Sequence, residues 1–260
     1  MYLLYFIKNF KVQITYRFNV IVSLLAAFSI FLIKIIVWEA LYVGKEVISG
    51  ITLDETILYA IVSSILSALM STRLGDTLGE NIYQGRISID FIRPVKFKKF
   101  YITQDLSYIA HELFNSIILA VGMLMFYDNL KVDITLLSFS KFLLTSILAV
   151  ILNYQFTWLL GLTSFWLQTA WHIRWITSAL IKTFSGTVVP LWFYPEWMLN
   201  ISSILPYRYI FFDPVAILLG NDSKSFYEVF LIQLVWIITV TIIGHIIWRK
   251  AQSKVISQGG

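Results

Sequence analysis

Few side chains in this sequence are of the types that carry out catalysis. His111 and Glu112 begin the zinc-protease pattern H-E-x-x-H, but Asn115 stands where the second histidine ligand would be. The chain has three histidines and no cysteine, which excludes thiol nucleophiles, thiolate metal sites and disulfides. It also has no G-x-S-x-G turn. We therefore predict no catalytic residue and no metal site, and we expect His111 to pack between helices.

The sequence also lacks the loop that binds nucleotides in many ATPases. No G-x-x-x-x-G-K-[ST] pattern is present, so neither the backbone cradle for the phosphates nor its lysine is available. We therefore predict that this chain is not an enzyme and binds no cofactor. If ATP drives it, another polypeptide must hydrolyse the ATP.

Charged residues inside apolar stretches are the next candidates for chemistry. Lys34, Glu39, Asp105 and Glu112 lie within or near long apolar runs, and Lys34 and Glu39 could reach the interface. A channel or secondary transporter that works alone usually lines its path with such groups. Many secondary transporters also have interrupted hydrophobic segments in matching halves, and none occurs here. A self-contained secondary transporter or channel is therefore one hypothesis that stays open for this chain, and a membrane enzyme is another.

Long apolar helices are the elements that must position these residues. Of the 260 residues, 58% are hydrophobic and 13% charged, whereas typical chains have roughly 25% charged residues. A run of about 20 apolar residues crosses a bilayer as a helix. The pattern predicts an all-α membrane protein, in contact with lipid, that forms a single transmembrane domain over residues 1–260. Its six expected spans cover residues 20–43, 57–79, 106–127, 140–166, 175–193 and 226–248.

The first residues, 1–17, predict an amphipathic helix in the plane of the interface. Apolar residues recur there at helical spacing, opposite Lys8 and Lys11. A cytoplasmic extension of the first span is the alternative.

Basic residues indicate the orientation of the spans. They gather before residue 20, between 79 and 106, between 166 and 175, and after 248. The intervening loops carry mostly acids, namely Glu46, Asp54, Glu55, Asp128, Asp133, Glu196, Asp213 and Asp222. The excess of Lys and Arg predicts that both termini are cytoplasmic in a multi-pass protein of the cell membrane. The net charge of +5 fits such loops, and we expect no nucleic-acid partner.

Small residues recur every four positions in the second expected span. These are Ser63, Ser67, Ser71, Gly75 and Gly79. Such a ridge lets another helix approach closely. That helix belongs either to the same chain or to a second subunit.

The expected cytoplasmic segment 80–104 mixes basic with apolar side chains. Its candidate docking residues are Arg86, Ile87, Ile89, Phe91, Ile92, Arg93 and Pro94, followed by Lys96, Lys98 and Lys99. Exposed apolar residues among charges are typical of a surface that binds a partner protein. A basic loop on anionic headgroups is the alternative.

A second unusual segment, 186–220, is apolar but interrupted by prolines. Proline ends helices, so this segment is not an ordinary span. Irregular backbone at membrane depth needs protein or a water-filled cavity around it. We expect a re-entrant helical hairpin on the outer side between the last two spans, with an extracellular interfacial loop as the alternative. The candidate outer-gate residues are Pro190, Trp192, Phe193, Tyr194, Pro195 and Trp197.

These two segments resemble signatures of ABC-2 type transporter permeases. Residues 85–95 (GRISIDFIRPV) are similar to the family pattern G-x-I…L-L-R-P, with Phe91 and Ile92 where the family often has leucine. Residues 186–220 are similar to its late pattern G…P-L…F-P-x-W…L-P…P…G. Span number and orientation fit the short bacterial export permeases of that family.

The resemblance implies a function and a set of partners. The chain would be the membrane-spanning subunit of an ATP-driven exporter, paired with an identical or paralogous permease. A separate ATP-binding subunit would hold ATP and magnesium and dock on the segment after the second span. The aromatic hairpin would then form an extracellular gate.

Overall fold

The computed structural model describes residues 2–15, 17–127, 130–167, 170–221 and 224–258. Apart from a small hairpin of β1 (Val47–Ile48) and β2 (Ile51–Thr52), its elements are helices. They are α1 (Tyr2–Thr15), α2 (Arg17–Tyr42), α3 (Leu53–Leu69), α4 (Leu74–Tyr83), α5 (Ile87–Ile92), α6 (Phe97–Phe126), α7 (Leu136–Thr163), α8 (Ala170–Phe184), the 3₁₀ turn η1 (Leu191–Phe193), α9 (Glu196–Ile204), α10 (Pro206–Leu219) and α11 (Phe226–Gln258). The predicted all-α class is confirmed.

Five helical stretches in the described part are long and apolar enough to cross a membrane. They cover Val20–Tyr42, Leu53–Tyr83, Phe97–Met125, Leu136–Thr163 and Phe226–Gln252, and the second of them comprises α3 and α4. Helices α9 and α10 form a further apolar pair with a bend of 108° at the break between them. This bent pair is the helical hairpin expected between the last two spans.

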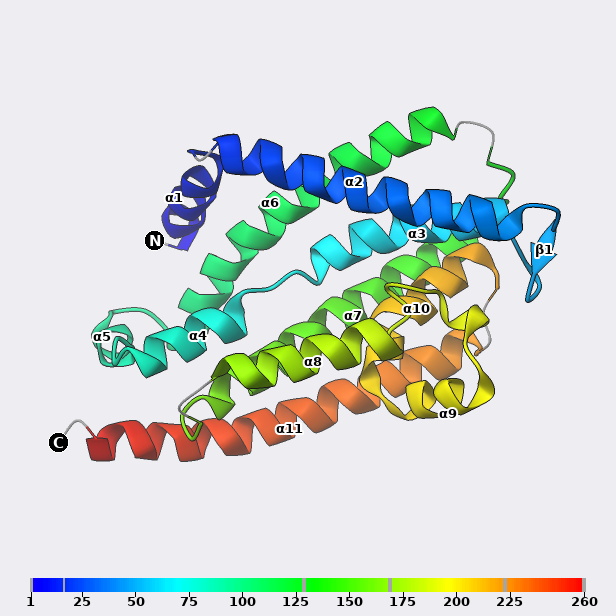
Figure 1. The fold of residues 1–260 in the computed structure, drawn as a ribbon. Coiled ribbons are helices and arrows are strands. Elements are labelled where there is room, and N and C mark those ends of the chain that lie inside the picture. The colour runs from blue at the N-terminus through cyan, green and yellow to red at the C-terminus, as the bar shows by residue number, and fades with distance from the viewer. Residues whose placement is uncertain (1, 16, 128–129, 168–169, 222–223, 259–260) are drawn as a thin grey trace.

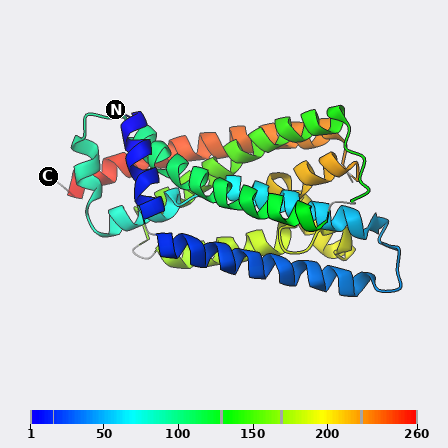
Figure 2. The same ribbon diagram turned by 90° about the horizontal axis from the view of Figure 1, so that it is seen from above.

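The long helices run side by side, so the bundle has two distinct ends. The N-terminus, the C-terminus and α5 lie at one end, while β1 and α9 lie at the other (Figures 1 and 2). Helix α1 is turned steeply away from α2 and packs against α6 (Figure 2). It is therefore a separate element and does not extend the first span.

Helix α10 lies at the centre of the core. It packs against α3, α7 and α11, and its residues are almost all buried. Pro206 starts the helix, where a missing N–H costs nothing, and Gly220 ends it in the left-handed conformation at φ +73°. The sequence placed Asp213 among loop acids, but it is 2% exposed and forms a salt bridge with Arg208 inside this helix. That assignment was wrong because the apolar run around Asp213 is a core helix.

The second predicted span is not one continuous helix. Helix α3 ends at Leu69 and α4 starts at Leu74, with Ser71 and Thr72 in the break. Serine and threonine side chains compete with helical backbone hydrogen bonds, which favours a break at this position. The five small residues therefore do not form one uninterrupted ridge.

The fifth predicted span also differs from the structure in extent. Helix α8 ends at Phe184 and has 15 residues, or about 22 Å, which is short of the roughly 30 Å hydrocarbon layer. Gly186 follows in the left-handed conformation at φ +80°, and a side chain there would meet Phe212 and Tyr59 at about 3.0 Å. The apolar stretch 185–193 is thus a tight connection to the hairpin.

Candidate functional site

Helix α5 is the short helix that the sequence singled out as a docking element. Gly85, at φ +70°, makes the turn from α4, and Arg93 is extended at the other end, as the following Pro94 requires. The helix lies at the end of the bundle that holds both termini (Figure 1). Backbone geometry therefore separates α5 from the spans on both sides.

A buried carboxylate fixes α5 to the bundle. Asp90 is 5% exposed and accepts hydrogen bonds from Tyr101 Oη at 2.6 Å and Asn81 Nδ2 at 3.3 Å. Its other oxygen lies 3.4 Å from Arg93 Nε. Helices α4, α5 and α6 are thus joined through one side chain. The sequence analysis missed Asp90, although it is the one acid within the basic segment 85–99.

The candidate docking residues divide into buried and exposed sets. Ile87 is 7% exposed and packs in the core with Leu74 and Leu78, so it anchors α5. Ile89 and Ile92 are 54% and 82% exposed.

The remaining docking candidates lie around this pair. Arg86 and Pro94 are also exposed. The Arg93 guanidinium lies 4.5 Å from the centre of the Phe100 ring. The side chain of Phe91 lies outside the described part of the structure.

The break between α3 and α4 is held by side chains from neighbouring helices. Asp105 on α6 accepts hydrogen bonds from Thr72 Oγ1 and, at 2.8 Å, from the Arg73 backbone N–H. Asn153 on α7 donates to the Met70 carbonyl at 2.8 Å. Polar backbone groups at membrane depth need such partners. Asp105, one of the charged residues considered for a transport path, is therefore a partner of the break.

Small residues bring α4 and α7 into close contact. A side-chain carbon added at Gly161 would lie 3.1 Å from Gly75 Cα, and one at Gly75 would lie 3.1 Å from the Thr157 carbonyl oxygen. Gly79 is buried as well. Gly75 thus packs against a helix of the same chain, which is one of the two interpretations of the small-residue pattern.

Aromatic rings attach the hairpin to the bundle. The Trp192 ring packs edge-on against Tyr59 and Phe212, with centroids 5.1 and 4.9 Å away. Its Nε1 donates to the Asn221 carbonyl at 2.9 Å. The Phe193 ring lies 4.8 Å from that of Trp38 on α2.

The other candidate gate residues lie around this attachment. Pro190 is buried and Tyr194 is half-buried. Pro195 and Trp197 are exposed, Trp197 to 62%. The six candidates therefore form an inner group that holds the hairpin and an outer rim.

The irregular backbone between α8 and η1 is bound by two spans. Tyr59 on α3 donates from its hydroxyl to the Gly186 carbonyl at 2.8 Å. Lys34 on α2 donates from Nζ to the Thr187 carbonyl at 2.9 Å. Lys34 points toward this segment instead of toward the interface, which the sequence alone did not indicate.

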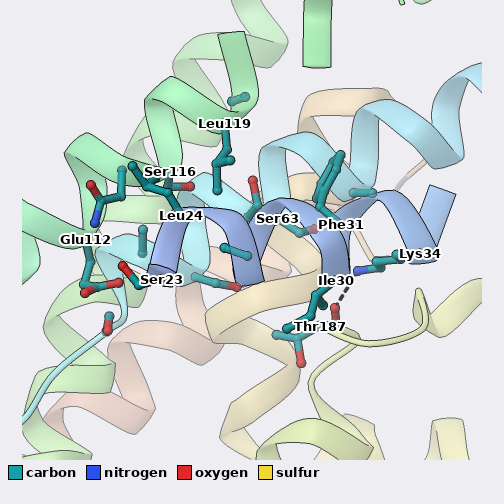
Figure 3. A pocket seen from close by; sticks show the side chains of 18 residues that line it. Ser23, Leu24, Ile30, Phe31, Lys34, Ser63, Glu112, Ser116, Leu119 and Thr187 are labelled. Atoms are coloured by element: carbon teal, nitrogen blue, oxygen red, sulfur yellow. Dashed lines mark hydrogen bonds between the residues drawn. The ribbon is translucent and has the colours of Figure 1, made fainter. Parts of the chain in front are cut away.

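Two cavities flank Ser67 of α3 and Ser71 of the following break. One, of about 400 Å³, lies between α2, α3 and α6 and is lined by Lys34, Ser63 and Glu112 among others (Figure 3). The second, of about 410 Å³, lies between α4, α7 and α8. Ser67 and Ser71 line both. These serines therefore face cavities, and a packed helix interface does not cover them.

The contacts of His111 show how the zinc-protease-like residues on α6 are used. His111 is buried, and its Nδ1 lies 3.5 Å from both Glu112 Oε1 and Asn115 Nδ2. In the described part of the chain, no three His, Asp or Glu side chains gather as a metal site. The helix-packing interpretation of His111 fits this position.

Comparison with protein families identifies the architecture. The sequence profile described as ABC-2 family transporter protein matches residues 4–259, nearly the whole chain. The chain belongs to this family. Among curated proteins, none matches it in sequence.

An ABC-2 family transporter protein is the membrane permease component of ABC-type transport and is not itself catalytic. This chain is accordingly a multi-pass membrane protein. The family that residues 85–95 and 186–220 indicated is thereby confirmed.

The sequence analysis of this ABC-2 transporter protein missed the residues that hold the irregular segments. Asp90 and Asn153 bind groups outside their own helices, and Arg208 pairs with Asp213 within α10. Two of them carried a weak signal in the sequence: Asp90 is an acid within a basic segment, and Arg208 stands five residues before Asp213 in an apolar stretch. Asn153 carried no such signal.

Proposed function

We propose that this permease forms half of the translocation pathway of an ATP-driven exporter. ATP and magnesium bind to a separate ATP-binding subunit, which docks on the α5 end of the bundle. A second permease, identical or paralogous, supplies the other half. Members of the family generally work with an ATPase subunit, which supports this assignment.

The presentation of α5 is the observation that carries the proposal. Ile89 and Ile92 are exposed beside basic residues on a helix that Asp90 fixes to two neighbours. A docking element needs apolar anchors to fill a groove and charges around them to guide association. A rigid attachment also lets a displacement of α5 pass into the bundle.

A route for that displacement leads through named contacts. Asp90 joins α5 to Tyr101 on α6, and one turn further along α6 Asp105 binds the break between α3 and α4. Beyond the break, Tyr59 on α3 binds the segment that precedes the hairpin. We propose that docking and ATP-driven movement at α5 alter the hairpin through this chain of contacts, and that the hairpin acts as the outer gate.

The distribution of charge supports the proposed orientation. The basic residues of segment 85–99 lie at the same end of the bundle as both termini (Figure 1). The excess of Lys and Arg at that end is typical of the cytoplasmic side. We therefore place both termini and α5 in the cytoplasm and the hairpin outside the cell membrane.

The surface of α2 supports the proposed pairing with a second permease. This helix is the most hydrophobic span, yet only 6% of its apolar window is buried within the chain. Lipid or another permease must cover such a surface. If the pathway lies between two permeases, α2 is expected to be largely uncovered in the single chain.

Charge insertion at α5 tests the docking proposal. We expect Ile92→Asp to abolish copurification of an ATP-binding subunit, because burying an unpaired carboxylate costs far more than burying a neutral polar group, for which the cost is roughly 2–7 kcal/mol. Lys99→Ala, an exposed charge seven positions away, should retain the subunit. The measurement is the amount of ATPase that copurifies with each tagged variant, at equal membrane expression.

Lys98 is not a suitable control. It is half-buried, and its Nζ lies 5.3 Å from the Trp158 ring, so its removal would disturb packing. Wild-type copurification of the ATPase with both Ile92→Asp and Ile89→Asp would exclude α5 as the docking element.

A further inference from the structure

The cavity between α2, α3 and α6 carries charge at membrane depth. Figure 3 shows Lys34 at one end of this cavity and Glu112 at the other. Its volume of about 400 Å³ falls within the usual range of ligand sites, about 300–1,000 Å³. Charged groups inside membrane spans usually face a path or a ligand site.

Lys34 is deep within its span. It lies about 12 Å along the axis of α2 from the end at Tyr42, at about 1.5 Å per residue. Within the described residues, its ammonium has one hydrogen-bond acceptor, the Thr187 carbonyl. An ammonium has three N–H donors. Lys34 therefore retains donors for an anionic group that enters the cavity.

The walls of the cavity suit an apolar chain. Leu24, Ile30, Phe31 and Leu119 line it together with several alanines. Ile30 is also 68% exposed on α2, so the rim of the cavity reaches the surface that faces lipid. A molecule can thus enter from the side.

Polar groups on the floor complete the site. Asn115 is 7% exposed, lines the cavity, and its Oδ1 has no hydrogen-bond partner among the described residues. Buried polar atoms normally have partners, so the described residues leave one hydrogen bond unmade in the wall of the cavity. Glu112 disfavours an anion at its own end, which fixes the orientation of any anionic ligand.

We propose that this cavity binds an amphipathic molecule whose anionic group pairs with Lys34 and whose apolar chain lies along α2. The proposal deepens the transport function above, on which it rests where it names anionic amphiphiles as the class of substrate. The Thr187 carbonyl and the bound anion share one ammonium. Because the ammonium has three donors, it can bind the anion and the Thr187 carbonyl together, and substrate occupancy is thereby linked to the segment that precedes the hairpin.

Photo-crosslinking to the full chain in phosphatidylcholine nanodiscs tests the site. The probe is hexadecyl phosphate with a diazirine on its chain, and the matched probe is the corresponding hexadecanol. We expect the phosphate to label peptides of α2, α3 or α6 at least tenfold more than the alcohol. Lys34→Met should remove at least nine-tenths of this labelling, Lys34→Arg should retain it, and Lys141→Met, on α7 outside the cavity, should leave it unchanged.

A second pair of variants leaves the Lys34 contact in place. Ala27 lines the cavity and Ala26 does not, so Ala27→Trp should block labelling and Ala26→Trp should not. Equal labelling by the alcohol, or full competition by millimolar inorganic phosphate, would overturn the proposal in favour of an apolar groove or a free-anion site. No ATPase takes part in this measurement, so its outcome is independent of the ATPase copurification test.

Discussion

Arg208 and Asp213 form a salt bridge within the most buried helix of the protein. Arg208 Nε lies 3.1 Å from both carboxylate oxygens, and the two side chains are only 6% and 3% exposed. A buried pair of this kind rarely increases stability over an apolar pair, but breaking it is costly. Its value here is therefore in the position that it gives to α10 within the hairpin.

The first prediction concerns this pair. Arg208→Met removes both hydrogen bonds to the Asp213 carboxylate, and we expect it to lower the free energy of unfolding by about 3–5 kcal/mol. The double variant Arg208→Met/Asp213→Leu should recover most of that loss, because no charge stays in the core. Thermal unfolding in detergent measures both. A double variant no more stable than the single one would contradict the argument.

At the residue scale, the sequence predicted some features and could not reveal others. Pro94 and Gly85 impose local geometry, so the ends of α5 were predictable from residue type. Ile87 and Ile92 have the same chemical character, yet one is buried and the other exposed. That difference depends on the packing of α4 and α6 around α5, which no short pattern encodes.

At two helix ends in this protein, side chains from other helices bind the irregular backbone that follows. The break between α3 and α4 depends on Asp105, and the end of α8 depends on Tyr59 and Lys34. In each case the partner comes from a different span. The sequence analysis predicted neither break, since it continued the second span to residue 79 and the fifth to residue 193.

The second prediction concerns the break between α3 and α4. Asp105→Leu leaves the Arg73 N–H and the Thr72 hydroxyl without this acceptor, which should cost about 1–3 kcal/mol for each group. Thr72→Val removes only the hydroxyl and should have a smaller effect. Hydrogen exchange at residues 70–74 should be faster in Asp105→Leu than in Thr72→Val. Equal exchange in both variants and wild type would show that the carboxylate does not hold the break.

The third prediction concerns the hairpin. Trp192→Ala removes the ring that packs on Tyr59 and Phe212, so we expect a looser hairpin and increased ion leak through proteoliposomes. Trp197→Ala, at an exposed position, should change the leak much less. Both variants should assemble with their partners. Unchanged leak in Trp192→Ala, with normal assembly, would limit these rings to anchoring.

The existence of the hairpin, unlike its contacts, was predictable. Four prolines in an apolar stretch exclude a continuous span, and the bent pair of α9 and α10 is the result. Its boundaries were less accessible, since the apolar residues after Phe184 look like the rest of a span. The left-handed backbone and close contacts of Gly186 end the apolar run of α8 and begin the connection to the hairpin.

The whole molecule has one end with both termini and one end with the hairpin. Charge asymmetry in the sequence predicted that both termini lie together with α5, and the bundle has this arrangement (Figure 1). What the sequence could not give is the degree to which each span is covered by the others. The low burial of α2 emerged only from the packed structure.

The fourth prediction tests the sidedness of the bundle. Single cysteines replace exposed residues of this cysteine-free chain, Tyr83 at the α5 end and Val43 and Leu136 at the hairpin end. In intact cells, an impermeant thiol reagent should label Val43→Cys and Leu136→Cys but label Tyr83→Cys only after lysis. The reverse pattern would invert the proposed orientation and place α5 outside the cell.

The packing of α1 on α6 sets an order for the synthesis of the protein. Tyr2 accepts a hydrogen bond from the Lys96 N–H, and Gln13 donates to Ser107, in each case across 94 residues of sequence. At translation rates of about 5–20 residues per second, α1 leaves the ribosome roughly 5–20 s before its partner helix exists. During that time only the bilayer surface or the insertion machinery can cover its apolar side chains. Helix α1 thus reaches its final position only after α6, the third span, has been synthesised.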